Sequence, residues 1–79
     1  MNIKELRKKA MALPLLPGVY IMRDRSHNII YIGKAKALKN RVSQYFGSQN
    51  NHQEKVRRMV SNVYDFDYII TDSEFEALI

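Results

Sequence analysis

Two short runs of strand-forming residues, separated by a polar turn, constrain the fold of this 79-residue chain more than any other feature. The runs cover residues 19–24 and 28–33; both contain isoleucine and tyrosine, and the first also contains valine. Ser26, which lies between the runs, and Asn28, which begins the second run, are residue types that favour turns. The pattern therefore predicts a β-hairpin.

The register of this hairpin decides which side chains share a face. With an even number of residues in the loop, successive residues alternate between two defined faces. One face then consists of Val19, Ile21, Ile30 and Ile32, and the other consists of Tyr20, Met22, Ile29, Tyr31 and Gly33. We expect the first, purely aliphatic face to be buried as core. The second face brings two tyrosines together.

Hydrophobic periodicity predicts the remaining elements. Helices are expected over residues 2–12, over residues 35–46 and in a segment after residue 51, and residues 71–79 open a last helix. We predict an α+β fold in which a small three-stranded antiparallel sheet (residues 18–24, 28–33 and 63–71) is flanked by helices. Because the last helix stops within an apolar run, we expect residues 1–79 to be a single domain, the N-terminal part of a longer chain.

The charge of the chain is unevenly distributed. The formal net charge is +5 at pH 7, and all the lysines and arginines lie within residues 1–58, where only Glu5, Asp24 and Glu54 oppose them. Residues 59–79 contain acids and no base. A basic body is suited to a polyanion such as nucleic acid. A merely soluble basic surface is the alternative interpretation of the same charges.

Composition also restricts the cellular setting. The chain has no cysteine, which excludes a disulfide framework and a thiolate metal site and suits the cytoplasm. A basic start followed by an apolar stretch has the order of a signal peptide, but Pro14 and Pro17 interrupt the apolar run. We therefore assign this segment to the mature domain. No segment has the length of a membrane span, and we expect no membrane partner.

Three motifs carry a resemblance to a known family. They are LPLLPGVYIMRD (13–24), IIYIGKAKALKNRVSQYF (29–46) and TDSEFEALI (71–79). Together they resemble the GIY-YIG nuclease family, and within it the branch that forms the N-terminal domain of the UvrC subunit of bacterial nucleotide excision repair. The resemblance implies a cytoplasmic, monomeric DNA endonuclease that makes the incision on the 3′ side of a lesion. It also implies damaged DNA as substrate, and UvrB with the UvrA/UvrB system as partners through regions outside this chain.

The same resemblance assigns roles around the nucleophile. The tyrosine at the position of Tyr31 activates the attacking water, and Tyr20 matches a tyrosine of its hydrogen-bond network. A free phenol has a pKa of about 10, so this role needs nearby positive charge, which Lys34 and a metal ion are expected to supply. The missing side chain of Gly33 would allow a phosphate to approach the backbone. Without the resemblance, both tyrosines would be ordinary strand aromatics.

Arg41 and Tyr45 match the family's residues at the scissile phosphate. They are four residues apart, so a helix would place them on one face, with Lys34 approximately in line just before the helix. An arginine there binds phosphate bidentately and stabilises developing charge.

Glu76 matches the metal-binding carboxylate of the family. One carboxylate with waters and phosphate oxygens forms an ordinary site for a single Mg²⁺ or Mn²⁺ ion. The alternative is structural, since Ser73-x-x-Glu76 is also a capping box. His27 and His52 are expected on the surface, without metal-ligand spacing.

The sequence departs from the family's residue pattern at two positions, and it leaves two alternative functions possible. The family often has asparagine where this chain has Ala37, and the family's asparagine downstream of the metal glutamate would lie beyond Ile79. A non-catalytic basic module that binds nucleic acid would use the same charged surface, but it has no need of Glu76. A GIY-YIG nuclease outside the UvrC subunit is the other alternative.

Overall fold

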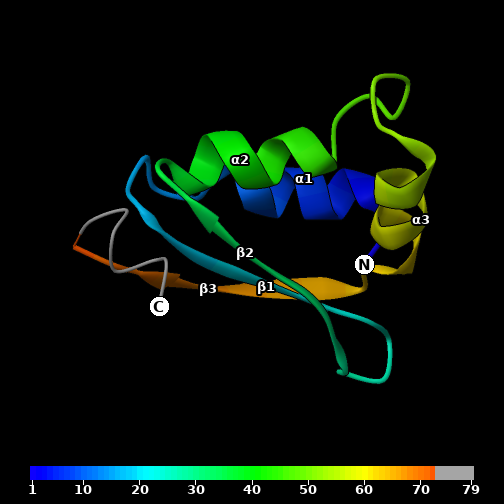
Figure 1. Cartoon of the computed structure of the whole chain (residues 1–79), viewed down its shortest axis with the longest axis horizontal. Coiled ribbons are helices and arrows are strands. Elements are labelled where there is room, and N and C mark those ends of the chain that lie inside the picture. The colour runs from blue at the N-terminus through cyan, green and yellow to red at the C-terminus, as the bar shows by residue number, and fades with distance from the viewer. Residues whose placement is uncertain (73–79) are drawn as a thin grey trace.

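The computed structural model describes residues 1–72. Along the chain the elements are α1 (Ile3–Met11), β1 (Gly18–Arg23), β2 (Ile29–Ala35), α2 (Leu38–Tyr45), α3 (Glu54–Asn62) and β3 (Asp65–Ile70). The strands form one antiparallel sheet in the order β2-β1-β3, and α1 and α2 lie over one of its faces (Figure 1). The predicted α+β fold is confirmed. No helix within residues 1–72 is long and apolar enough to span a membrane.

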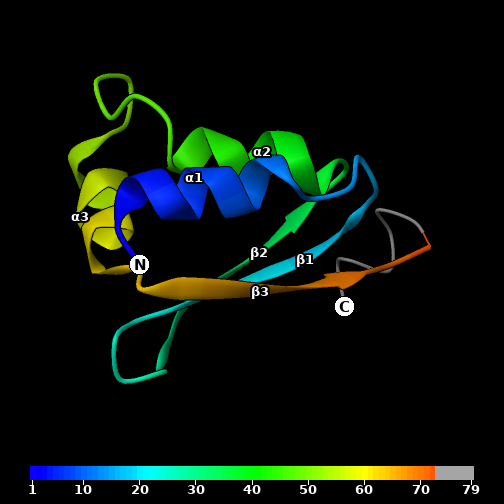
Figure 2. The same cartoon turned by 180° about the vertical axis from the view of Figure 1, so that it is seen from behind.

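The hairpin has the predicted register through most of its length, but the buried face is the opposite one. Tyr20 lies opposite Gly33, and Met22 lies opposite Tyr31. Tyr20 and Met22 are 1% and 0% exposed, whereas Ile32 is 56% exposed. The expectation of a buried aliphatic face is therefore wrong. Both faces are apolar enough to be buried, and α1 and α2 cover only one of them (Figure 2). The burial of Tyr20 and Met22 identifies the covered face as the one that carries the tyrosines.

A bulge corrects two further assignments. The register shifts between Met22 and Arg23, so Arg23 lies opposite Ile29 and Ile30 is the additional residue. A bulge turns the affected side chains relative to the regular alternation. Ile30 consequently packs against the core, whereas Ile29 is exposed. This reverses the faces expected for these two isoleucines.

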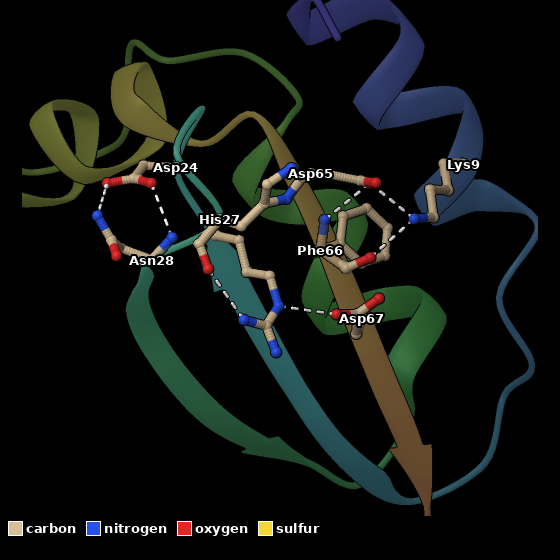
Figure 3. Close-up of polar contacts among 8 residues, drawn as sticks. Lys9, Asp24, His27, Asn28, Asp65, Phe66 and Asp67 are labelled. Carbon is tan, nitrogen blue, oxygen red and sulfur yellow. Dashed lines mark hydrogen bonds and ion pairs between the residues drawn. The ribbon is translucent and has the colours of Figure 1, made fainter.

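The loop between β1 and β2 is held by its own polar groups. The Asp24 carboxylate accepts hydrogen bonds from the backbone N–H groups of Ser26 and Asn28, at 2.9 Å each. Figure 3 shows the contacts between Asp24 and Asn28. His27 adopts a positive φ of 67°. These contacts form a tight turn on the exposed end of the hairpin, and His27 is a surface residue as expected.

The core lies between the sheet and the helices. Its buried members are Leu6, Ala10, Leu13, Tyr20, Met22, Ala35, Leu38, Val42, Phe46, Val60, Val63 and Phe66. The rings of Phe46 and Phe66 stack with centroids 5.8 Å apart, which joins the end of α2 to β3. Burial of these apolar side chains is the main force that fixes α2 against the sheet.

The proline-containing connector between α1 and β1 holds the start of α2. Ala37 is the N-cap residue of α2 and provides no side-chain cap. The N–H of Leu38 donates instead to the carbonyl of Leu16 at 2.9 Å, and that of Lys39 donates to the carbonyl of Pro14 at 3.2 Å. Two of the N–H groups that a helix start leaves unpaired are thereby satisfied. These backbone bonds take the place of a side-chain cap at the start of α2.

Ion pairs join elements that lie far apart in the sequence. The Lys9 ammonium donates to the Asp65 carboxylate and to the Phe66 carbonyl, each at 2.7 Å, and so joins α1 to β3 (Figure 3). Partial burial opposes ionisation of Asp65, but hydrogen bonds from Lys9 and from the Phe66 N–H hold the pKa of Asp65 below its ordinary value. Arg23 pairs with Asp67 across the sheet at 2.9 Å.

Candidate active site

Three tyrosines from three different elements meet on the helix-covered side of the sheet. Tyr20 comes from β1, Tyr31 from β2 and Tyr45 from the end of α2. The ring centroids are 6.1 Å apart for Tyr20–Tyr31, 5.7 Å for Tyr20–Tyr45 and 6.3 Å for Tyr31–Tyr45. The structure thus brings together all three of the tyrosines that the sequence singled out.

The cluster runs from the core to the surface. Tyr20 is 1% exposed and its hydroxyl lies 2.8 Å from the hydroxyl of Tyr45, whereas Tyr31 is 42% exposed. Burial, together with the hydrogen bond to Tyr45, raises the pKa of Tyr20 far above its ordinary value. Tyr20 is therefore a neutral hydroxyl that fixes Tyr45. Tyr31 is the more accessible of the two strand tyrosines.

The described surroundings of Tyr31 raise its pKa, whereas nearby positive charge was expected to lower it. The neighbouring Tyr45 raises the pKa of Tyr31 above its ordinary value, mainly because two phenolates would repel each other. Arg41 acts in the opposite direction and lowers it. Within residues 1–72, the net effect favours the neutral phenol. Ionisation of Tyr31 near neutral pH therefore needs further positive charge at the site.

Lys34 is separated from the tyrosines by the pleat of β2. It lies opposite Val19 in the sheet, so its Cβ points to the other face from that of Tyr31. It also precedes α2, which begins at Leu38, and therefore does not share a helix with Arg41. Lys34 and Arg41 instead line one cavity at the edge of β2. Lys34 was expected to supply positive charge near Tyr31, but its Cβ points to the other face of the sheet.

Gly33 leaves space for Tyr20. The two residues are cross-strand partners, and a Cβ at Gly33 would overlap the ring and hydroxyl of Tyr20. The two Gly/Tyr triplets, Gly18-Val19-Tyr20 and Tyr31-Ile32-Gly33, are therefore linked by packing, because the glycine of the second accommodates the tyrosine of the first. An approach of phosphate to the Gly33 backbone remains a prediction.

A contact at the end of α2 was missed by the sequence analysis. The side-chain amide of Gln49 donates to the carbonyl of Tyr45 at 2.9 Å, and Nε2 of His52 lies 3.3 Å from the same oxygen. Carbonyls at a helix C-terminus lack partners within the helix, so these side chains satisfy one and restrain Tyr45. No motif reveals this contact, because it depends on how the following loop folds back.

The predicted metal ligand, Glu76, lies outside the described residues. Within residues 1–72, no group of three or more histidines, aspartates or glutamates is arranged to hold a metal ion. The described part of the site instead offers hydroxyl oxygens and the Arg41 guanidinium. Both are suited to water and phosphate oxygens, and a carboxylate is the kind of ligand that this set lacks.

Comparisons with known proteins agree with this geometry. Residues 16–79 match the model of the UvrC-like GIY-YIG domain. UvrABC system protein C of Clostridium tetani is 66% identical over 67 residues, covering 85% of this chain and 11% of that protein. Its counterpart in Clostridioides difficile is 60% identical over 78 residues, covering 99% of this chain and 12% of that protein. The chain thus spans only a small part of the length of these relatives.

A solved structure matches almost the whole chain. The GIY-YIG N-terminal endonuclease domain of UvrC from Thermotoga maritima, bound to magnesium as its catalytic divalent cation, superposes with a TM-score of 0.81 at 38% identity. The match covers 99% of this chain and 82% of that domain. Variants of that domain with a single tyrosine replaced by phenylalanine are also described as bound to the catalytic cation.

Proposed function

The chain belongs to the family of UvrC-like GIY-YIG endonuclease domains, and we propose that it cuts DNA by metal-dependent phosphodiester hydrolysis. In this proposal it makes the incision on the 3′ side of a lesion during bacterial nucleotide excision repair. The observation that carries the proposal is the convergence of Tyr20, Tyr31 and Tyr45, with Arg41 close enough to influence the pKa of two of them.

Tyr31 serves the nucleophile. Its hydroxyl belongs to the more exposed of the two strand tyrosines, so a water molecule can reach it. While neutral, it orients that water through hydrogen bonds, and it accepts a proton only when added positive charge lowers its pKa. Tyr20 acts indirectly, since its buried hydroxyl holds Tyr45 in place.

Arg41 and Tyr45 bind the scissile phosphate. Arg41 is exposed on α2 one turn before Tyr45, so both side chains reach the same side of the helix. The guanidinium offers a bidentate grip and offsets the charge that develops on the phosphate oxygens. Lys34, which shares a cavity with Arg41, adds positive charge at the edge of this position. In this proposal the phosphate also approaches the backbone of Gly33, whose side-chain position is occupied by the Tyr20 ring.

Glu76 holds the divalent cation, Mg²⁺ or Mn²⁺. When bound, such a cation stabilises negative charge on phosphate oxygens and lowers the pKa of coordinated water. The tyrosine variants of the Thermotoga maritima domain remain bound to the cation, which supports a division of labour between the tyrosines and the metal ligand. In this chain, the tyrosines serve the nucleophile and phosphate, and Glu76 serves the metal.

The biological setting follows from the relatives. The matched proteins are named as components of a UvrABC system, which supports damaged DNA as substrate and UvrA and UvrB as partners. We place the chain in the cytoplasm as a monomeric module. Its basic residues 1–58 favour contact with the DNA backbone and supply little sequence specificity.

A domain exchange tests the proposed function. This chain replaces the corresponding residues of the Clostridioides difficile protein, and incision of a damaged duplex is measured with UvrA, UvrB and Mg²⁺. We expect 3′ incision by the exchanged protein and its loss on Glu76→Gln, with DNA binding retained. Glu54→Gln, an exposed carboxylate on α3, is the matched control and should cut normally.

The same experiment separates the alternative functions. A non-catalytic module that binds nucleic acid predicts DNA binding without metal-dependent incision in both the parent and Glu76→Gln. Equal incision by the parent and Glu76→Gln would contradict the metal assignment. Incision that takes place without UvrA and UvrB would favour a nuclease that acts outside the excision system.

A further inference from the structure

Two cavities lie on either side of Arg41 along α2. The first, of about 330 Å³, lies between the end of β2 and the first turns of α2. The second, of about 190 Å³, lies between the last turn of α2 and the start of α3. Arg41 and Gln44 line both of them. A DNA strand whose scissile phosphate is held by Arg41 would therefore have a cavity on each side.

The first cavity is lined by groups that bind anions. Besides Arg41 and Gln44, its polar lining consists of Lys34, Lys36 and Asn40. No carboxylate from the described residues lines it. Cations and amide N–H groups are suited to phosphate oxygens.

Asn40 and Gln44 are the neutral donors of this cavity. They are four residues apart on α2, so their side chains lie on one exposed face of the helix. Among residues 1–72, neither side-chain amide has a hydrogen-bond partner. They are free to donate to a ligand at no cost to the internal hydrogen bonds of the fold.

The second cavity has a different chemistry. Its other lining residues are Tyr45, His52 and Val56, so it adds no lysine or arginine to Arg41. The rings of Tyr45 and His52 are 6.4 Å apart. Nε2 of His52 is already directed to the carbonyl of Tyr45. The two sides of Arg41 are therefore unequal: Gln44 lines both cavities, and only the first adds lysines and a second side-chain amide, that of Asn40, for a second phosphate.

We infer that the cavity lined by Lys34, Asn40 and Gln44 binds one backbone phosphate adjacent to the scissile phosphate, on one side only. The inference rests on the proposed function, because it takes Arg41 as the place of the scissile phosphate. Asn40 and Gln44 are then positioning residues, which fix the strand in the site by a contact that carries no sequence information. Each amide contributes about two- to tenfold in affinity, the net worth of one hydrogen bond.

Short oligonucleotides test this inference on the isotope-labelled 79-residue chain. The probes are the thymidine dinucleotide, which has one internucleotide phosphate, and the trinucleotide, which has two. Binding is followed by NMR through backbone signals and the side-chain amide signals of Asn40 and Gln44. The variants are Asn40→Ala and Gln44→Ala. Gln53→Ala, an exposed amide at the start of α3, is the matched control.

We expect the trinucleotide to shift the amide signals of Asn40 and Gln44 together with signals of Arg41 and Tyr31. Each variant should weaken trinucleotide binding by about two- to tenfold, with little effect on the dinucleotide. Gln53→Ala should bind both probes normally. A trinucleotide in which a methylphosphonate neutralises one linkage should lose the advantage over the dinucleotide.

The possible failures are distinguishable. Shifts at Arg41 and Tyr31 without shifts at Asn40 and Gln44, or variants that bind the trinucleotide like the parent, overturn the inference and leave the proposed function intact. Shifts at Asn40 and Gln44 without shifts at Arg41 and Tyr31 contradict the proposed scissile-phosphate site. Variants that weaken both probes equally show that the amides do not bind a second phosphate. An absence of shifts along α2 overturns both proposals.

Discussion

The two faces of the sheet consist of alternate residues of the same strands, yet they differ in what covers them. On the helix side, Tyr20, Met22 and Phe66 are 0–1% exposed. On the other side, Ile32 and Ile69 are 56% and 57% exposed, and α1, α2 and α3 all lie away from that face (Figures 1 and 2). The candidate active site is therefore built into the covered face, at the edge where the core meets solvent.

This difference shows how a small domain can hold a hydroxyl cluster rigidly. Tyr20 is both a core residue and a neighbour of the site, so the packing that stabilises the fold also fixes the hydrogen bond to Tyr45. Tyr31 lies on the same face, but on the edge strand β2. A site on the open face would have no such support, because no described element packs against it.

The largest expected effect comes from Tyr31→Phe. The change removes one exposed hydroxyl and should leave the free energy of unfolding nearly unchanged. Single-turnover incision by the exchanged protein should fall by about 10²- to 10⁴-fold, the usual contribution of a general base. Tyr64→Phe is the matched control, since Tyr64 has similar exposure outside the cluster, at 38% against 42%. A similar loss of rate in both variants would remove the functional distinction of the cluster.

Much of this arrangement could be predicted from the sequence. Alternation and turn chemistry predicted the hairpin, and the parity of the register placed Tyr20 and Tyr31 on one face. The periodicity and Pro14 predicted α1, whose start is confirmed by a capping box between Asn2 and Glu5. The i, i+4 spacing placed Arg41 and Tyr45 on one side of α2. These features depend on residues that are close together in the sequence, so the sequence pattern alone determines them.

The choice of the buried face could not be predicted in this way. Both faces of the hairpin are apolar, so alternation fixes their membership without deciding which one the helices cover. That decision depends on how the connectors route α1 and α2, as in the bonds from Leu38 and Lys39 to the carbonyls of residues 14 and 16. The bulge at Ile30 and the contact of His52 with Tyr45 likewise depend on tertiary structure.

A pair of neighbouring substitutions in β1 measures the difference between the faces directly. Met22→Ala should lower the free energy of unfolding by about 2–5 kcal/mol, because a fully buried side chain leaves a cavity. Ile21→Ala, one residue earlier and only half-buried, should cost clearly less. Urea denaturation of the 79-residue chain measures both. Equal costs would show that the covered and open faces contribute alike to stability.

Gly33→Ala tests whether the covered face depends on the packing of the two triplets. The new methyl group overlaps the Tyr20 ring, so Tyr20 must shift, and we expect a loss of about 1–3 kcal/mol in the free energy of unfolding. Gly47→Ala is the control, because its nearest contact is the flexible end of Arg7. The Tyr45 signals in NMR spectra should move in Gly33→Ala alone. An unchanged stability and an unchanged Tyr45 would mean that the glycine is not required by Tyr20.

The smallest effect is expected on the open face, from Ile32→Thr. Threonine keeps the β-branch that suits a strand, and the side chain at this position is mostly in water already. We therefore expect the free energy of unfolding of the 79-residue chain to change by no more than about 0.5 kcal/mol. The same substitution in the exchanged protein tests the open face in its longer context. A cost there of more than about 1 kcal/mol would require that the open face is covered by groups outside residues 1–72, since loss of buried apolar contact has that magnitude. A small cost in both would establish that this face stays open, and that the sheet needs only one covered side to carry the site.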